Sequence, residues 1–144
     1  MSFVVENNGE QQVEALLNGL LGSAEFGSWV GGELVLGNGE EIQLINPATG
    51  AMFMTYRDAG ESVVSAAADA AVQAQKVWWA MSASARGRLM WQCAETIKQS
   101  AELLAQLESV SAGKPIRDCR VEVAKVSEMF EYYAGWCDKM TGEV

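Results

Sequence analysis

Apolar residues recur every three or four positions through the C-terminal half of the chain, and this spacing constrains the fold more than any other feature. One set steps by 4, 4, 4, 3 and 3 residues, and a second set steps by 4, 3, 4, 3 and 4. Residues at these intervals lie on one face of an α-helix. Together with an alanine-rich segment that ends near Ala80, they predict a mainly α segment with three long helices. The two sets are Leu89, Cys93, Ile97, Ala101, Leu104 and Leu107, then Cys119, Val123, Val126, Phe130, Tyr133 and Cys137.

The predicted helices carry signals at their ends. Asp58 and Glu61 match a capping box, in which a side-chain oxygen caps the helix and a carboxylate follows three residues later. Residues 113–115 (Gly-Lys-Pro) combine a C-cap glycine, a cation at the negative end of a helix and a proline that stops it. The other helix boundaries are expected at Ser82 or Ser84, at Asp118 and at Gly142.

Residues 1–57 hold most of the glycines and predict short β-hairpins before the three helices. The Gly-Asn-Gly sequence of residues 37–39 is a strong hairpin-turn signal. Residues 41–45 alternate polar and apolar side chains, as a half-buried strand does. The expected elements are a short helix over residues 12–21 ended by Gly22, strands over 29–36, 41–45 and 52–56, and a second turn over 46–50.

The composition fits one globular domain without contacts to nucleic acid or membrane. Of the 144 residues, 49% are apolar and 20% are charged. The net charge of -9 disfavours nucleic acid and anionic membrane surfaces, because phosphate binding needs clustered Lys and Arg. No apolar run approaches the ~20 residues of a membrane span. The first residues lack the basic and apolar regions of a secretory signal. We therefore expect a cytoplasmic protein whose three cysteines are free thiols.

The residue types needed for a self-contained active site are not assembled in this sequence. Histidine is absent, which removes the usual general base and the commonest metal ligand. A nucleophilic cysteine needs a helix N-terminus, a base or a cation beside it. Cys137 is instead expected near a helix C-terminus and on a core stripe, and Cys93 also lies on a core stripe. Cys119 is near a helix start but has no base to partner it.

Two further patterns have plain structural interpretations. Residues 31–32 and 37–39 fit neither the GxGxxG fingerprint nor the P-loop. Among Glu122, Glu128 and Glu131, the last two share one outward helix face, which we interpret as solvated rather than as an acid–base pair.

The adjacent Trp78 and Trp79 point about 100° apart on a helix. Some of this aromatic surface is therefore expected to face something beyond this chain.

An ordered series of short motifs runs from residue 29 to residue 139. In order and spacing it resembles the N-terminal part of the aldehyde dehydrogenase superfamily, over about residues 28–144. The series comprises Trp29-Val30-Gly31-Gly32, Ile45-Asn46-Pro47-Ala48-Thr49-Gly50, the alanine-rich helix ending in Trp79, Ser84-Ala85-Arg86-Gly87-Arg88-Leu89, Leu107-Glu108, Gly113-Lys114-Pro115 and Tyr132-Tyr133-Ala134-Gly135-Trp136-Cys137-Asp138-Lys139.

The resemblance implies an α/β family fold, of which residues 28–144 are an incomplete N-terminal part of the dinucleotide-binding domain. Residues 1–27 would be an extension with a short helix. The family oxidises aldehydes to acids with NAD or NADP, using a cysteine, a glutamate and cofactor-binding glycines that lie C-terminal to this segment. No catalytic or cofactor-binding residue is therefore carried over, and no cofactor is expected for the segment alone. Cys137 falls where the family commonly has alanine.

One minor site is implied by the same resemblance. Many family members bind a monovalent cation through backbone carbonyls after the second strand and an acidic position at the start of the third long helix. The matching positions are Leu44, Ile45 and Glu122, although aspartate is common at the last of them. The alternative is that Glu122 is a first-turn acid favoured by the helix dipole.

Three interpretations of the whole chain stay open. The first is an N-terminal aldehyde dehydrogenase segment, inactive alone, whose partner is the remainder of the fold. The chain stops just past the third predicted helix, which we interpret as an interruption. The second is a non-enzymatic interaction module that docks on a full-length relative, and the third is a decayed remnant. The complete protein is expected to be a homo-oligomer.

Overall fold

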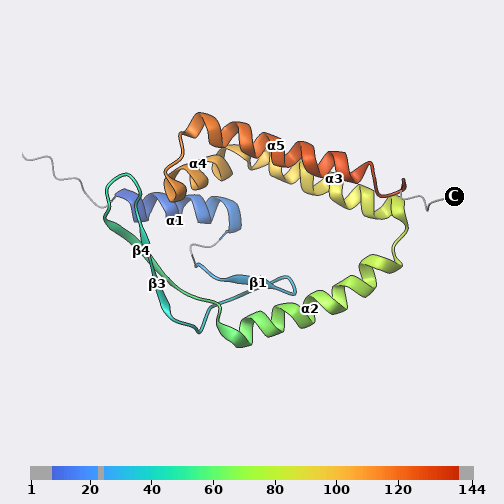
Figure 1. Ribbon diagram of the computed structural model, residues 1–144, viewed down its shortest axis with the longest axis horizontal. Coiled ribbons are helices and arrows are strands. Elements are labelled where there is room, and N and C mark those ends of the chain that lie inside the picture. The colour runs from blue at the N-terminus through green and yellow to red at the C-terminus, as the bar shows by residue number, and fades with distance from the viewer. Residues whose placement is uncertain (1–7, 23–24, 140–144) are drawn as a thin grey trace, which may run out of the picture.

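The computed structural model describes residues 8–22 and 25–139 and is drawn in Figure 1. Helices dominate, and the strands are short and paired in twos. Along the chain the elements are α1 (Asn8–Leu21), β1 (Ser28–Val30), β2 (Glu33–Val35), β3 (Glu41–Ile45), β4 (Met52–Arg57), α2 (Gly60–Ala80), α3 (Ala83–Gln99), α4 (Ala101–Ala112) and α5 (Ile116–Ala134).

The elements form two groups that lie on opposite sides of the molecule. Helices α3 and α5 run side by side, α4 packs against α5, and α1 packs against α4. The β1–β2 ribbon and α2 lie along the other side, where α2 contacts β1. The β3–β4 ribbon runs from this side to α1, which contacts β4. Figure 1 shows that α2 diverges from the α3–α5 pair along most of its length.

The predicted strand over residues 29–36 is wrong in one respect, because it is a complete hairpin. Strands β1 and β2 pair antiparallel, with Trp29 opposite Leu34. The turn between them is made by Gly31 and Gly32, whose φ angles of 62° and 94° are the left-handed conformations that a two-residue hairpin turn requires. A β-branched or bulky residue at either position would be strained.

Residues 37–39 do not form the predicted hairpin turn. They connect β2 of one ribbon to β3 of the other, and their backbone N–H groups donate to the carbonyls of Asp58 and Ala59, between β4 and α2. Gly37 is required by close approach, since a Cβ there would lie 2.2 Å from the Asp58 carbonyl oxygen. The Gly-Asn-Gly sequence of residues 37–39 therefore reflects close backbone packing and not a hairpin turn.

The second ribbon follows the prediction closely. Strand β3 pairs antiparallel with β4, and Leu44 lies opposite Met54. The predicted turn at residues 46–50 is confirmed: the Asn46 Oδ1 accepts the Ala48 N–H at 2.8 Å, and Gly50 closes the turn with φ 71°.

Two of the predicted helix starts are wrong. The capping box at Asp58 does not form: α2 begins at Gly60, and no side chain caps it. Gly60 has φ 76°, a left-handed conformation that glycine adopts readily. Helix α5 begins at Ile116 after Pro115, so Asp118 lies inside the first turn rather than at the cap. Ser82 does cap α3, accepting the Ala85 N–H, as predicted.

The second predicted long helix is two helices. It breaks at Ser100 (φ −100°, ψ 8°) into α3 and α4, which both pack on α5. The break lets α4 contact α1 while α3 follows α5. Gly113 ends α4 in the left-handed conformation, as predicted. Helix α5 ends at Ala134, earlier than predicted, and Gly142 lies outside the described residues.

Two small clusters form the core. One joins α1 to β4 through Val13, Leu17, Phe53 and Met54, with Leu44 packed against it. The other joins α4 to α5 through Ala105, Cys119 and Val123. Among the helices of the described residues, none has the length and apolar character needed to cross a membrane.

Candidate interaction surface

Helices α3 and α5 contact each other through small residues. The buried positions of α3 are Gly87 and Ala94, and those at the matching levels of α5 are Ser127 and Ala134. A Cβ at Gly87 would lie 2.9 Å from the Ala134 carbonyl oxygen, so the two backbones approach closely. The buried Ser127 Oγ donates a hydrogen bond to the Ala94 carbonyl at 3.1 Å.

This close contact overturns part of the predicted core stripes. Leu89 is 39% exposed and Cys93 is exposed, because the small face of α3, and not its large apolar face, packs on α5. On α5, Val126 and Tyr133 are likewise exposed. The seven-residue spacing of small residues in both helices was the signal in the sequence that pointed to this contact.

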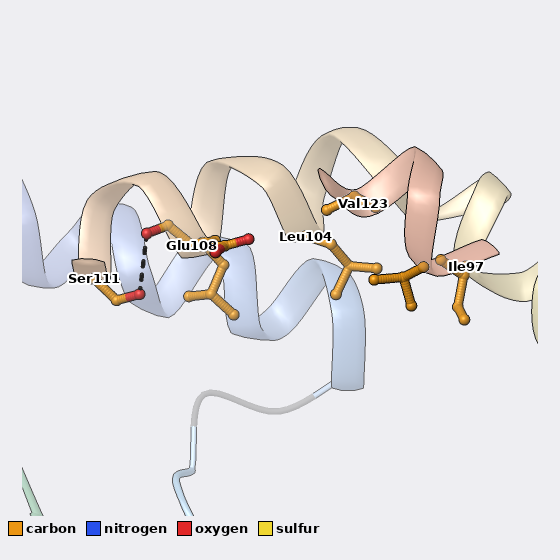
Figure 2. Close-up of a pocket in the computed structure, with 7 residues that line it drawn as sticks. Ile97, Leu104, Glu108, Ser111 and Val123 are labelled. Atoms are coloured by element: carbon orange, nitrogen blue, oxygen red, sulfur yellow. Dashed lines mark hydrogen bonds between the residues drawn. The ribbon is translucent and has the colours of Figure 1, made fainter. Parts of the chain in front are cut away.

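A groove lined mainly by apolar side chains lies on the helical layer, and Val126, which the α3–α5 contact leaves exposed, is one of its lining residues. The groove has a volume of about 500 Å³ and runs between α3, α4 and α5 (Figure 2). Phe130 and Tyr133 continue the groove-lining face of α5, at helical spacing from Val126. Val123, from the α4–α5 core cluster, is buried beneath the groove. We call the other apolar residues the apolar surface; they comprise Ile97, Leu104, Leu107, Val126, Phe130 and Tyr133.

Helix α2 presents a second apolar face. Of its 21 residues only Val63 is buried. Val72 and Val77 are more than half exposed, and Trp79 is 75% exposed, with the Arg86 guanidinium 5.8 Å from its ring centroid. A helix of this length with one buried residue gains little from packing inside this chain, because helical stability in proteins comes mainly from a buried apolar face.

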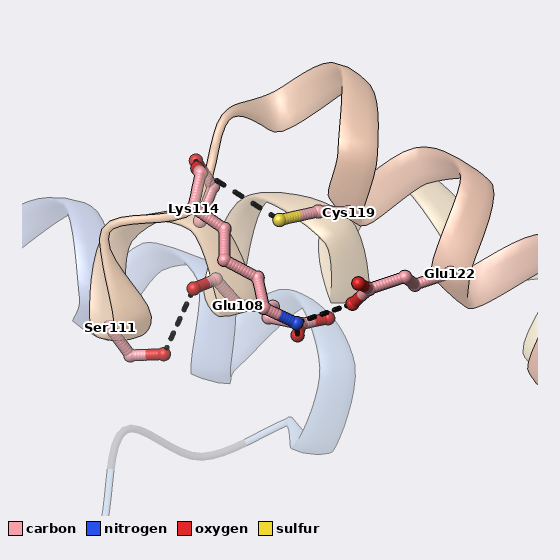
Figure 3. A network of polar contacts seen from close by, with 6 residues as sticks. Glu108, Ser111, Lys114, Cys119 and Glu122 are labelled. Carbon is pink, nitrogen blue, oxygen red and sulfur yellow. Dashed lines mark hydrogen bonds and ion pairs between the residues drawn. The ribbon is translucent and has the colours of Figure 1, made fainter.

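An ion network lies at one end of the apolar surface (Figure 3). The Lys114 Nζ lies 2.6 Å from the Glu108 carboxylate and 2.5 Å from that of Glu122, which joins α4 to α5. Its hydrogen bonds to Glu108 and then to Glu122 raise the pKa of Lys114 above its usual range. The same ammonium lowers the pKa of Glu122, so this carboxylate stays ionised and paired.

The pairing bears on the predicted cation site at Leu44, Ile45 and Glu122. Leu44 packs against the α1–β4 cluster, and Ile45 is half exposed at an irregular position of the ribbon. The charge of Glu122 is already neutralised by Lys114, so its carboxylate fits the role of a cation ligand poorly. Within the described residues there is also no group of three or more His, Cys, Asp or Glu side chains that could hold a metal. The cation site stays a prediction.

The three cysteines occupy three different environments. Cys119 is fully buried, and burial raises the pKa of its thiol, which opposes thiolate formation. Cys137 is half-buried between α3 and α5, with its Sγ 3.6 Å from the Met90 sulfur. Cys93 is exposed, so its predicted core position is wrong.

The remaining acidic candidates are engaged in surface ion pairs. Glu131 is bound by Lys98, and Glu128 lies 2.6 Å from the Lys125 Nζ on the same helix. Glu128 is exposed and Glu131 is half-buried, consistent with the predicted solvated face. Neither carboxylate is arranged beside the other for acid–base work.

The helix starts do not form a dinucleotide cradle in the described part of the chain. Of the positive-φ glycines, only Gly60 opens a helix, and the Asn38 side chain fills the space beside it. A carboxylate also stands in the first turn of α2, α4 and α5, where a pyrophosphate would need an open positive end. Helix α3 has no carboxylate in its first turn, but the Ser82 side chain caps its start and no glycine-rich loop precedes it.

Comparison with known proteins identifies the molecules that this chain resembles. A family model described as the aldehyde dehydrogenase family matches residues 34–144. The (Z)-2-((N-methylformamido)methylene)-5-hydroxybutyrolactone dehydrogenase of Acinetobacter baylyi is 36% identical over 136 residues, covering 92% of this chain and 25% of the relative.

Solved structures agree with the sequence match. HpcC from Thermus thermophilus matches with a TM-score of 0.80 and 29% identity, covering 92% of this chain and 26% of that one. PnpE in complex with nicotinamide adenine dinucleotide matches with a TM-score of 0.74 and 36% identity, covering 81% and 24%. The chain spans about a quarter of the length of these relatives.

Proposed function

The chain belongs to the aldehyde dehydrogenase family, and from that premise we propose that it is the N-terminal helical layer of an NAD-dependent enzyme that oxidises an aldehyde to a carboxylic acid. The reaction belongs to the complete protein, because the chain spans about a quarter of its relatives. Residues 1–144 supply structure: they present the apolar surface and the open face of α2 to the rest of the fold.

The single observation that carries this proposal is the exposed apolar surface. Phe130 is 36% exposed, and Val126 and Tyr133 are 46% and 52% exposed. Apolar area of this kind, continuous with a groove, is typical of an interface. Burying it stabilises an assembly by roughly 25 cal/mol for each Å² removed from water.

We infer that this chain carries no chemistry of its own, and independent features of the described residues support this inference. The buried Cys119 thiol has a raised pKa, the candidate acids Glu122, Glu128 and Glu131 are used in ion pairs, and a carboxylate stands in the first turn of α2, α4 and α5. NAD is proposed for the complete protein because the PnpE relative was solved with that dinucleotide. The cytoplasmic location and the homo-oligomeric state stay predictions.

The proposal is tested by complementation. Purified 1–144 is mixed with an aldehyde dehydrogenase relative from which the matched segment has been deleted, and NADH formation is followed with a panel of aldehydes. We expect no NADH from either piece alone and activity from the mixture. NADH from purified 1–144 alone would refute the assignment of all chemistry to the remainder.

A matched pair of variants shows whether the apolar surface makes the contact. Val126→Lys places a charge in the groove, whereas Val121→Lys places the same charge at an exposed position (61%) on another face of the same helix. We expect the first to abolish complementation and the second to leave it intact, with the helical circular dichroism of both unchanged. Intact complementation in both would place the interface elsewhere, and equal loss in both would show that the effect is not specific to the groove. Co-elution of 1–144 with an intact relative, lost in Val126→Lys only, would favour the alternative of an interaction module.

A further inference from the structure

The loop that connects the two β-ribbons is fastened to the start of α2. The backbone N–H of Asn38 donates to the Ala59 carbonyl at 3.3 Å, and that of Gly39 donates to the Asp58 carbonyl at 2.9 Å. The Asn38 side chain donates from Nδ2 to the Ser62 Oγ at 2.8 Å. The side-chain bond joins the loop to a position in α2 that lies 24 residues further along the chain.

The sequence Asn38-Gly39 is also a chemically reactive pair. Glycine has no side chain to hinder its backbone nitrogen, so this nitrogen can attack the side-chain amide carbon of the preceding asparagine. The attack forms a bond between Gly39 N and Asn38 Cγ and breaks the Cγ–Nδ2 bond. Solvent removes the Gly39 N–H proton and ammonia leaves. Water then opens the cyclic imide at either carbonyl, which gives aspartate or isoaspartate at position 38.

We propose that Asn38 is a deamidation site, and that the folded structure slows the reaction through hydrogen bonds to Ser62 and Asp58. The Gly39 nitrogen is held by its bond to the Asp58 carbonyl, and the departing Nδ2 is held by Ser62. The Asn38 Oδ1 packs against Gly60 so closely that a Cβ there would lie 2.2 Å away. The Cγ therefore reaches the Gly39 nitrogen only when the loop opens, and the reaction rate follows the opening equilibrium.

Modification would release the start of α2. Isoaspartate inserts an extra methylene into the backbone between positions 38 and 39, so the two backbone bonds to residues 58 and 59 lose their register. The new carboxylate would also lie beside Glu61, which lines the same hollow as Asn38. The main described contact of α2 is with β1. Loss of the hydrogen bonds made by residues 38–39 therefore leaves α2 with fewer contacts to the rest of the chain.

The test measures deamidation at position 38 in purified 1–144 at mildly alkaline pH. Peptide mapping by mass spectrometry and labelling by an isoaspartyl methyltransferase follow the reaction with time. Folded protein is compared with protein in urea, with Ser62→Ala, and with Ser65→Ala as a matched control on the same hollow. Ser62→Thr retains a hydroxyl acceptor and serves as the rescue variant.

We expect the reaction to be slowest in the folded protein, in Ser65→Ala and in Ser62→Thr. Ser62→Ala should react about fivefold faster, the factor expected for the loss of one neutral hydrogen bond, and the protein in urea should react fastest. Equal rates in folded protein and in urea, or equal rates in Ser62→Ala and Ser65→Ala, would overturn the proposal. No modification in urea would show that the pair is not a site at all.

Discussion

The Ser127 hydroxyl donates a hydrogen bond to the Ala94 carbonyl at 3.1 Å inside the α3–α5 contact, where both residues are buried. This bond joins two helices across 33 residues of sequence. It lies within the contact between the small, buried faces of the two helices.

Replacing this serine tests the contact. Ser127→Ala keeps the small volume and removes the hydrogen bond, so we expect a loss of about 1 kcal/mol in the free energy of unfolding. Urea unfolding monitored by circular dichroism gives this value. Ser65→Ala, at an exposed position of α2, is the control and should change stability by less than about 0.5 kcal/mol. Equal effects in both variants would contradict the assigned role.

Close approach of the helices makes Gly87 sensitive to the smallest side chain. Gly87→Ala brings a Cβ to within 2.9 Å of the Ala134 carbonyl oxygen, a backbone atom that moves only with α5. We expect a destabilisation of about 1–3 kcal/mol in spite of the better helix propensity of alanine. Gly19→Ala is the matched control, because its Cβ meets only a terminal methyl of Leu103 at 3.2 Å. A neutral Gly87→Ala would mean that the helices lie further apart.

The ion pair between Glu102 and Arg120 predicts an acid-dependent loss of stability. Arg120 donates from Nε at 2.9 Å and from Nη2 at 2.7 Å, and Gln106 donates a third bond. These bonds lower the pKa of Glu102 from its ordinary 4.5 to about 2. A depressed carboxyl pKa contributes stability above the ordinary value and loses it as the pH falls toward the folded value. The window is therefore from pH 4.5 down to about 2.

This contribution is isolated by comparing two arginine variants. Arg120→Gln removes the pair, so its stability should differ most from that of the original chain above pH 4.5 and converge with it near pH 2. Thermal melts across this range give the difference. Arg117→Gln is the control, since Arg117 is 85% exposed and its neighbouring Asp118 is half exposed. A difference between the original chain and Arg120→Gln that is constant with pH would refute the linkage.

The three thiols should react with Ellman's reagent at different rates. Cys93 is exposed and should be modified first, and Cys137 is half-buried and should follow. Cys119 is buried and its pKa is raised, so we expect it to react about a hundredfold more slowly or only after unfolding. Cys93→Ser should remove the fast phase alone. A fast phase that persists in this variant would show that another thiol is open to solvent.

Local patterns determined the local structure. The turn at residues 46–50, the Ser82 cap and the Gly113 helix end depend on neighbours in sequence, so they were predictable from residue types alone. The helical character of residues 60–134 followed from periodicity, because spacing of three and four residues identifies helix wherever the helix packs. The ordered motifs likewise identified the family.

Only the tertiary structure decided which helix faces are used. Periodicity predicts one apolar face per helix, and it favoured the large residues Leu89 and Cys93; packing instead selected Gly87 and Ala94, since two backbones in close contact leave no room for larger side chains. Contacts between distant segments likewise decided that residues 37–39 bond to Asp58 and Ala59 instead of forming a hairpin turn. The free energy of a contact between residues distant in sequence depends on both partners, so it cannot be predicted from one segment alone. These contacts left the apolar surface exposed.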